Sequence, residues 1–334
     1  MGTLGLAPSA AASGGGEAAK APQAIYRDMQ EAMRSASFLV IHGQGTYQDG
    51  STVVENTSAT PTATHFVTTS NRVPLEQLSV RGATYVRGGN FGTEWILASR
   101  DPRCVMAGIS QTFDFAHAGT LTKGAVTTLG RKRVIEIDDD GKAPNATPKR
   151  VSVSLDGAPL PVRVVTTGAM TPGPTECPLD AIMANPLVSG TEDWSFNGHA
   201  AAIPTPKPFI DGSVGLLAQA TYTPAANLFS AMLTNLNNQF GQITDLAAAQ
   251  ANFQQTADLF KGFAGTLSAI KFPGSVQGQA QNLINLANTI ATDTANNAAA
   301  AGQGDPNVVT MFNQQQSQFD AAQNTFATQL QQAL

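Results

Sequence analysis

The chain has 334 residues, of which only 13% are charged, about half the share found in an ordinary soluble protein. Hydrophobic residues make up 42%, which is enough for folded cores, and a chain of this length usually forms about two domains. The formal net charge of −5 argues against a nucleic-acid partner, since such a partner is bound by a basic surface. No apolar run approaches the roughly 18 residues of a membrane-spanning helix, so no transmembrane segment is expected.

Residues 1–21 are rich in Ala, Gly and Ser, and we expect them to form a disordered N-terminal tether. They lack the basic and apolar regions of a signal peptide, although they resemble the stretch that follows such regions, as if the start were clipped. The segment Ala10–Gly16 resembles the cleavage box and flexible tether of a bacterial lipoprotein. Ser13 stands where that box has its lipid-bearing cysteine, and an ordinary disordered tail is the alternative interpretation.

A helix is predicted over residues 22–37, where Ile25, Met29 and Met33 recur on one face. From residue 38 to residue 203 the period changes to two, and runs rich in Val, Thr, Tyr and Ile alternate with short turns. Such turns favour antiparallel hairpins, and the lack of alternating helices argues against a parallel sheet. The predicted strands are Leu39–Tyr47, Thr64–Thr69, Leu75–Arg81, Thr84–Arg87, Glu94–Leu97, Leu121–Thr128, Arg131–Asp138, Arg150–Leu155, Leu160–Thr166 and Trp194–Asn197.

Two segments interrupt or end this strand pattern. Asp101–Ala118 mixes apolar residues with Pro and Gly, and it predicts one or two short helices packed on the sheet. Ile203–Phe209 is proline-rich, and repeated proline blocks both helix and ladder, so it marks the domain boundary. We therefore expect a sheet domain over residues 22–204 and a linker over residues 205–215.

Residues 216–334 are predicted to form an up-and-down four-helix bundle. Its helices are expected at about Pro224–Phe240, Asp245–Ile270, Pro273–Asn297 and Asp305 to the end. The heptad-spaced apolar residues are Leu246, Phe253, Phe260, Leu267, Val276, Leu283, Ile290, Phe312, Phe319 and Phe326. From Ser213 onward the chain has no Glu, Arg, His, Cys or Trp, so this region can bind but has almost nothing with which to catalyse.

Motifs for catalysis and metal binding are incomplete. The four histidines, His42, His65, His117 and His199, lie far apart, and none forms a metal-binding i, i+4 pair. Ser268–Lys271 matches SxxK, but the partner motifs of that chemistry do not occur in the chain. We therefore predict no catalytic residue, no metal and no cofactor.

Two further patterns allow more than one interpretation. Glu136–Gly141 imitates the first half of a calcium loop, but Thr147 stands where a bidentate Glu is required, so a polar hairpin turn is the better account. Cys104 and Cys177 are the only cysteines. They fit one disulfide in an oxidising compartment, which we predict, or two unpaired thiols in the cytosol.

Several segments of the strand region resemble, in the same order, actinobacterial envelope lipoproteins of the LppX/LprG type. Glu31–Ser37 ends a helix before the first strand, and Leu78–Arg87 is similar to that family's hairpin, in which a Gly turn precedes Tyr-Val. Trp95 stands where the next strand often has Trp, and Thr127–Val134 resembles the segment that follows. The most specific match is Asp156–Val164, which resembles the family's Gly-x-Pro-x-Pro-x-Arg entry to a late strand.

The resemblance covers roughly residues 24–204 and implies the LolA-like fold, a curved antiparallel half-barrel with helices against its concave side and an apolar cavity. Together with the helical region it implies an α+β protein in which a separate all-α four-helix bundle follows the half-barrel. Members of the family whose role is understood carry lipids or lipidated molecules across the envelope. Such a carrier needs an apolar pocket that excludes water, because each methylene group kept from water is worth about 0.8 kcal/mol. It needs no reactive residue.

We therefore expect a non-enzymatic, extracytoplasmic protein, in the cell envelope or secreted, that holds or carries a lipid or another hydrophobic ligand. Strand alternation gives the candidate ligand-binding residues Leu39, Ile41, Leu78, Val80, Ile135 and Ile137. The same alternation is also that of an ordinary closed core. The alternative function is an envelope interaction protein with a filled β-core, whose helical bundle binds a protein partner.

Overall fold

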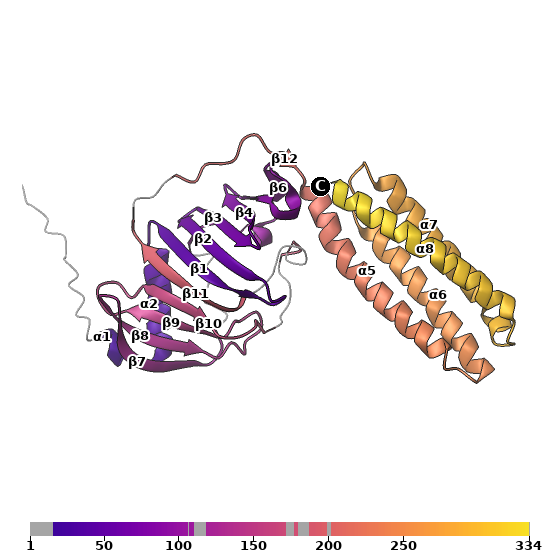
Figure 1. The fold of residues 1–334 in the computed structure, drawn as a ribbon, viewed down its shortest axis with the longest axis horizontal. Helices are drawn as coiled ribbons and strands as arrows, with labels where there is room; N and C mark the ends of the chain where they lie inside the picture. The colour runs from indigo at the N-terminus through magenta and orange to yellow at the C-terminus, as the bar shows by residue number, and fades with distance from the viewer. Residues whose placement is uncertain are drawn as a thin grey trace, which may run out of the picture. The chain divides into compact units, whose positions relative to one another are not determined.

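The computed structural model describes residues 16–105, 107–109, 118–171, 177–179, 187–198 and 202–333. The chain is an α+β protein that folds into two compact units, and their main boundary in the sequence falls between Ile210 and Asp211. The first unit is built on a β-sheet and the second is a helical module, as Figure 1 shows. No helix in these ranges combines the length and the apolar character needed to cross a membrane. Ser13, His117 and His199 lie outside the described residues.

The sheet unit opens with two helices, α1 (Gly16–Ala19) and α2 (Pro22–Arg34). Pro22 lies in the first turn of α2, where a missing N–H removes no helical hydrogen bond. Ile25, Met29 and Met33 are at most 2% exposed and follow one another at four-residue spacing. The predicted helix forms because this single apolar stripe can be buried against the sheet.

Twelve strands of the described residues form one sheet. They are β1 (Leu39–Tyr47), β2 (Thr52–Thr60), β3 (Ala63–Ser70), β4 (Val73–Val80), β5 (Ala83–Gly88), β6 (Ile96–Ser99), β7 (Leu121–Leu129), β8 (Lys132–Asp139), β9 (Lys149–Ser154), β10 (Pro161–Thr166), β11 (Leu187–Phe196) and β12 (Ile210–Asp211). Their order is β12-β6-β5-β4-β3-β2-β1-β11-β10-β9-β8-β7. One meander therefore runs outward from β1 to β6 and another from β11 back to β7, and the antiparallel pair of β1 with β11 joins them.

Every neighbouring pair between β6 and β7 across this order is antiparallel, as the hairpin turns predict. The turn between β4 and β5 illustrates the reason, because Arg81 and Gly82 both have positive φ, at 52° and 71°. Two successive residues in this region give the tight turn whose twist matches that of the flanking strands. Of the segment 101–118, which is predicted to form one or two short helices, the described part contains a 3-10 turn at Pro102–Cys104. Residues 106 and 110–117 of that segment lie outside the described residues.

Gly45 lies where two strands approach each other closely. A Cβ on this residue would overlap the carbonyl oxygen of Ser189 on β11, so the close contact requires glycine. One residue further, the register between β1 and β11 shifts at Thr46/Tyr47, which is a β-bulge. The neighbouring strand β2 is not predicted from the sequence, because its inward positions include the polar Glu55 and Thr57 between Val53 and Ala59.

The main core of the sheet unit lies between α2 and the sheet. Most of its buried residues come from α2, β1, β2 and β7 to β11, and they include Ile25, Met29, Ile41, Ile137 and Trp194. A second, smaller cluster joins β3, β4, β5 and β6. α2 thus covers one half of the sheet, and the core residues of that half lie between the helix and the strands.

The helical unit contains four long helices, as predicted. They are α5 (Ser213–Phe240), α6 (Leu246–Ala269), α7 (Gln277–Ala301) and α8 (Pro306–Gln332). Asp245 and Asp305 cap the second and fourth helices by accepting hydrogen bonds from Ala247 N and Asn307 N. Phenylalanines dominate the core: Phe260, Phe319 and Phe326 are at most 1% exposed. Burial of such side chains holds the unit together, at roughly 1.5–3 kcal/mol each.

Two predictions for this unit are wrong. Pro224 was expected to begin the first helix, but it lies inside α5, which starts at Ser213. The turns before it bury Leu216 and Tyr222, and that burial offsets the roughly 3 kcal/mol cost of an internal proline. Leu246 was expected in the core seam, but it is 53% exposed because it begins α6, at the edge of the bundle. The predicted limits of the domains, at residues 21, 204 and 215, stay a prediction.

Candidate functional site

The six predicted ligand-binding residues are core residues. They are Leu39, Ile41, Leu78, Val80, Ile135 and Ile137, and each is at most 5% exposed. The four from β1 and β8 share one cluster with α2, whereas the two from β4 belong to the smaller cluster around Tyr85 and Leu97. The structure therefore brings four of them together and leaves two apart. Their contact with a ligand stays a prediction.

Two glutamates flank a glycine on the same face of the sheet as Ile41. Gly43 on β1 pairs with Glu55 on β2 and with Glu192 on β11, so the two carboxylates stand on either side of it. A Cβ on Gly43 would lie 3.1 Å from Glu192 Cγ and 3.5 Å from Glu55 Cβ. Glycine at this position therefore leaves the room that both side chains occupy.

Burial decides the protonation of this pair. Glu55 is 8% exposed, and its desolvation, followed by repulsion from Glu192, raises its pKa to about 8. A hydrogen bond from Thr57 Oγ1, at 3.3 Å, offsets this only in part. Desolvation also raises the pKa of Glu192, although Trp194 Nε1 donates to it at 3.0 Å and Lys149 lies near enough to oppose the shift. The raised pKa therefore favours the protonated, neutral form of Glu55 near neutral pH.

Two further ionisable groups of this face, Lys149 and Asp139, have structural partners. Lys149 is paired with the fully buried carboxylate of Asp139 at 3.9 Å, and desolvation lowers the pKa of the lysine. Asp139 Oδ1 accepts hydrogen bonds from Gly119 N and Gly141 N, which closes the turn that follows β8. The turn predicted in place of a calcium loop is thus held by backbone N–H groups that donate to the Asp139 carboxylate. No group of three or more metal-ligating side chains occurs among the described residues.

The described histidines have ordinary surface partners. His42 Nδ1 lies 2.7 Å from Asn56 Oδ1, and His65 Nε2 lies 3.2 Å from Glu76 Oε2. Ser268, the serine of the SxxK match, donates to the carbonyl of Ala264 within its own helix. These contacts give none of the three residues an arrangement suited to nucleophilic or acid–base catalysis.

The two cysteines form a disulfide between Cys104 and Cys177, and both are nearly buried. The bridge closes a segment of 73 residues and ties the turn after β6 to a point shortly before β11. Stable disulfides are typical of oxidising compartments outside the cytosol.

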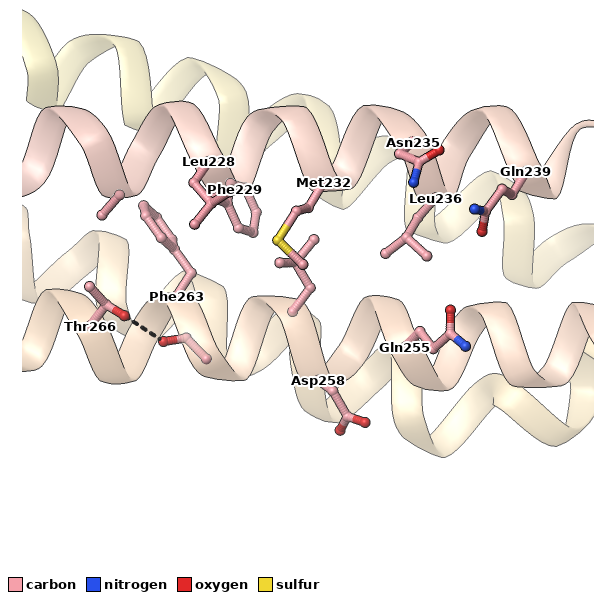
Figure 2. Close-up of a pocket in the computed structure, with 13 residues that line it drawn as sticks. Leu228, Phe229, Met232, Asn235, Leu236, Gln239, Gln255, Asp258, Phe263 and Thr266 are labelled. Atoms are coloured by element: carbon pink, nitrogen blue, oxygen red, sulfur yellow. Dashed lines mark hydrogen bonds between the residues drawn. The ribbon is translucent and has the colours of Figure 1, made fainter. Parts of the chain in front are cut away.

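A hydrophobic groove of about 770 Å³ runs between α5 and α6. Figure 2 shows Leu228, Met232 and Leu236 projecting from α5 toward α6, with Phe263 facing them from the other side. Leu228 is 63% exposed and Met232 is 47% exposed, which is unusual for large apolar side chains on adjacent turns of one helix. We call this surface the α5–α6 groove.

The floor and the rim of the α5–α6 groove differ in chemistry. Its floor is a stacked pair of rings, Phe229 and Phe263, with centroids 4.4 Å apart. Its rim carries amide and hydroxyl side chains beside the exposed Leu228 and Met232, and Asp258 is the one ionisable residue among those that line the groove. This groove is not predicted above, although the sequence of α5 contains a signal for it. Leu228-Phe229 and Met232-Leu233 are adjacent apolar pairs, which widen the apolar face of α5 beyond a single seam.

The sheet unit also has a depression, of about 880 Å³, at the ends of β1, β2, β10 and β11. Its lining is mostly Gly, Ser, Thr, Gln and Asn, with Val53, Val54 and Val165 as its apolar members. Hydroxyl and amide groups remain well hydrated in such a surface, so it offers a hydrophobic molecule less than the α5–α6 groove does. None of the six predicted residues lines either surface.

Comparison with known proteins does not assign the chain to a family. No family model matches the sequence, and no curated protein matches it. The solved structures that it resembles include the Mycobacterium tuberculosis lipoprotein LppX, at 16% identity and a TM-score of 0.35, covering 54% of this chain and 97% of LppX. MucB gives 13% identity and a TM-score of 0.34, covering 56% of this chain and 63% of that one.

The Pseudomonas aeruginosa MucA/MucB complex gives 12% identity and a TM-score of 0.32, covering 55% of this chain and 61% of that chain. The chain thus spans less than two thirds of the MucB chains that it matches. Scores of this size assign the protein neither to a family nor to a function.

Proposed function

We propose that this chain is a non-enzymatic binding protein of an extracytoplasmic compartment, which holds a lipid or another hydrophobic molecule between α2 and the sheet. The observation that supports this proposal is that α2 covers the apolar face of the sheet. An apolar face that includes Ile41 and Ile137 lies beneath a single 13-residue helix, and two of the side chains that fill the space are Met29 and Met33. Methionine is unbranched and repacks readily around a guest.

Polar contacts hold α2 at both of its ends. Lys123 Nζ donates to the carbonyls of Ala18 and Lys20 before the helix, and Ser37 N donates to Asn197 Oδ1 after it. Between these ends Ile25, Met29 and Met33 are buried in the core of the sheet unit, and an acyl chain would replace that apolar packing with similar contacts. The similarity of Asp156–Val164 and neighbouring segments to envelope carriers supports the same function.

The proposed location and the absence of catalysis rest on separate observations. The disulfide between Cys104 and Cys177 supports an oxidising compartment, in the envelope or outside the cell. We also propose lipid anchoring near Ser13, although this serine replaces the cysteine that bears the lipid in bacterial lipoproteins. The division of the chain into tether, sheet domain, linker and bundle is likewise a proposal. The absence of a reactive arrangement around the described histidines and serine supports binding without chemistry.

The test is mass spectrometry of the intact protein, purified from its own host under non-denaturing conditions, followed by titration with a fluorescent fatty acid. We expect a co-purifying lipid and saturable uptake of the probe. Met33→Lys, which places a charge under α2, should reduce uptake by about tenfold or more, whereas Met170→Lys, at an exposed methionine, should leave it unchanged. A clean protein mass together with no probe uptake would contradict the proposal.

The second candidate function is an interaction protein whose helical unit binds a protein partner. The α5–α6 groove favours it, because Leu228 and Met232 leave a contiguous apolar surface exposed at the rim of a preformed hollow. Both functions are compatible in one chain, since they use different units.

A further inference from the structure

We infer that the α5–α6 groove is a self-association surface, on which α5 of one copy of this chain packs antiparallel against α5 of a second copy. The inference deepens the second candidate function and identifies its partner. It requires that one surface supply both the projecting side chains and the hollow that receives them, because a twofold interface uses the same patch on both subunits.

The shape of the groove meets this requirement. Leu228 and Met232 project from α5 at its rim, and the hollow beside them is floored by Phe229 and Phe263. The lining on α5 runs from Ala225 to Gln239, about 21 Å along the axis at 1.5 Å per residue. A straight hollow of about four turns fits a helix, and an antiparallel copy inserts its own leucine and methionine there.

The charge of α5 favours its own copy over a charged partner. Its 28 residues contain no Asp, Glu, Lys or Arg. Two such helices meet without like-charge repulsion, whereas a basic or acidic peptide would find Asp258 as the one counter-charge or repelling charge in the lining. A helix with charged flanks would therefore lose hydration here without gaining ion pairs in return.

The rim residues are self-complementary in their hydrogen bonding. Asn235, Gln239 and Gln255 carry amides, which both donate and accept. An amide can therefore pair with an amide of the second copy across a twofold axis. A carboxylate or an ammonium group cannot do so, since each has only one kind of hydrogen-bonding function when charged.

Sedimentation of the full chain over a range of concentrations tests the inference. We expect a monomer–dimer equilibrium that Leu228→Glu weakens by at least about tenfold, because a carboxylate would be buried at the centre of the interface. Leu246→Glu is the matched control: Leu246 is also exposed, at 53%, but it lies outside the groove lining, and its variant should dimerise as the natural chain does. Circular dichroism checks that both variants remain folded.

Cross-linking gives an independent measurement. The natural cysteines are both in the disulfide, so Leu228→Cys introduces the one free thiol of its variant. A short bis-maleimide should convert it into a covalent dimer, whereas Leu246→Cys should associate as the natural chain does but give no covalent dimer. A natural chain that remains a monomer at about 100 μM and a Leu228→Cys variant that does not cross-link would overturn the inference.

The outcomes also separate this inference from the lipid-binding proposal. If the natural chain proved to be a monomer and Leu228→Glu abolished its fatty-acid uptake, the groove would be the lipid site. Both the self-association and the proposed lipid site under α2 would then be wrong. If the chain dimerised through Leu228 but took up no fatty acid, the self-association would stand and the carrier function would fail. Dimerisation that Leu228→Glu leaves intact would place the interface elsewhere and overturn the inference.

Discussion

At the scale of single residues, Glu55 and Glu192 are two acidic side chains that the fold buries side by side. Two carboxylates beside Gly43 repel each other when both are charged, and burial removes the water that would screen them. The folded chain avoids this cost by keeping a proton on Glu55 up to a pH of about 8. The stability of the sheet unit is therefore coupled to proton binding.

This coupling predicts a pH-dependent loss of stability. The pKa of Glu55 is raised in the folded state from its ordinary value of 4.5 to about 8, so the folded state holds a proton that the unfolded chain releases. Its contribution is fully present below about pH 4.5 and is lost as pH rises through 8. Glu55→Gln keeps the neutral form at every pH, so it should flatten this decline and make the chain more stable than the natural one at pH 9.

Denaturant unfolding followed by tryptophan fluorescence measures the effect, because both tryptophans lie in the sheet unit, at Trp95 and Trp194. We expect a gain at pH 9 of roughly 1–4 kcal/mol, since one unit of pKa shift corresponds to about 1.4 kcal/mol. Glu94→Gln, at an exposed glutamate, should have no such effect. Equal pH profiles for the natural chain and Glu55→Gln would show that the carboxylate of Glu55 does not hold its proton in the folded state.

At the scale of elements, the helical unit depends on aromatic packing. Phe319 on α8 is fully buried, and its ring centroid lies 5.1 Å from that of Phe260 and 5.4 Å from that of Phe229. The outer faces of the helices contribute few ion pairs, because charged residues such as Asp258 and Lys261 are rare in this unit. The stability of the bundle thus comes from area buried and from edge-to-face ring contacts.

Phe319→Ala should therefore destabilise the helical unit by about 3–5 kcal/mol, the usual cost of removing a buried phenylalanine from a well-packed core. Leu228→Ala is the control. It removes a large apolar side chain that is mostly exposed, so its free energy of unfolding should change by less than about 0.5 kcal/mol. The measurement is urea unfolding followed by circular dichroism of the full chain at low protein concentration. A loss of similar size in both variants would contradict the role of the aromatic core.

At the scale of the whole molecule, the chain consists of two compact units, and the disulfide and the two tryptophans all lie in the first. The units differ in what stabilises them. The sheet unit has long-range strand pairs, a cross-link and ion pairs such as Arg87 with Glu76. The helical unit has no cysteine, and the described residues of its four helices show no ion pair. Reduction of the disulfide should consequently affect one unit and spare the other.

Reduction is expected to lower the stability of the sheet unit by about 4 kcal/mol, the size predicted for a cross-link that closes a segment of 73 residues. Cys104→Ser with Cys177→Ser should reproduce the effect without a reductant. Tryptophan fluorescence should show the earlier transition, and helical circular dichroism should show an unchanged bundle transition. A single transition that moves as a whole in both signals would mean that the two units unfold together.

Much of the fold was predictable because it follows from local periodicity. The helix over Pro22–Arg34, the hairpin at Arg81–Gly82 and the caps at Asp245 and Asp305 each depend on residues within a few positions of one another. The strand β2 was not predictable in this way. Its inward residues include Glu55 and Thr57, and a strand with polar residues on its core side lacks the alternation that identifies strands.

Sequence alone determined the change of period from helix to strand and back to helix, and the near absence of reactive side chains after Ser213. Those properties depend on residue type and short spacing. Only the tertiary structure decided that Cys104 meets Cys177, that Glu55 faces Glu192 across Gly43, and which apolar residues of α5 stay exposed. The physical reason is that each of these depends on a neighbour distant in sequence, whose position is set by strand register and helix packing.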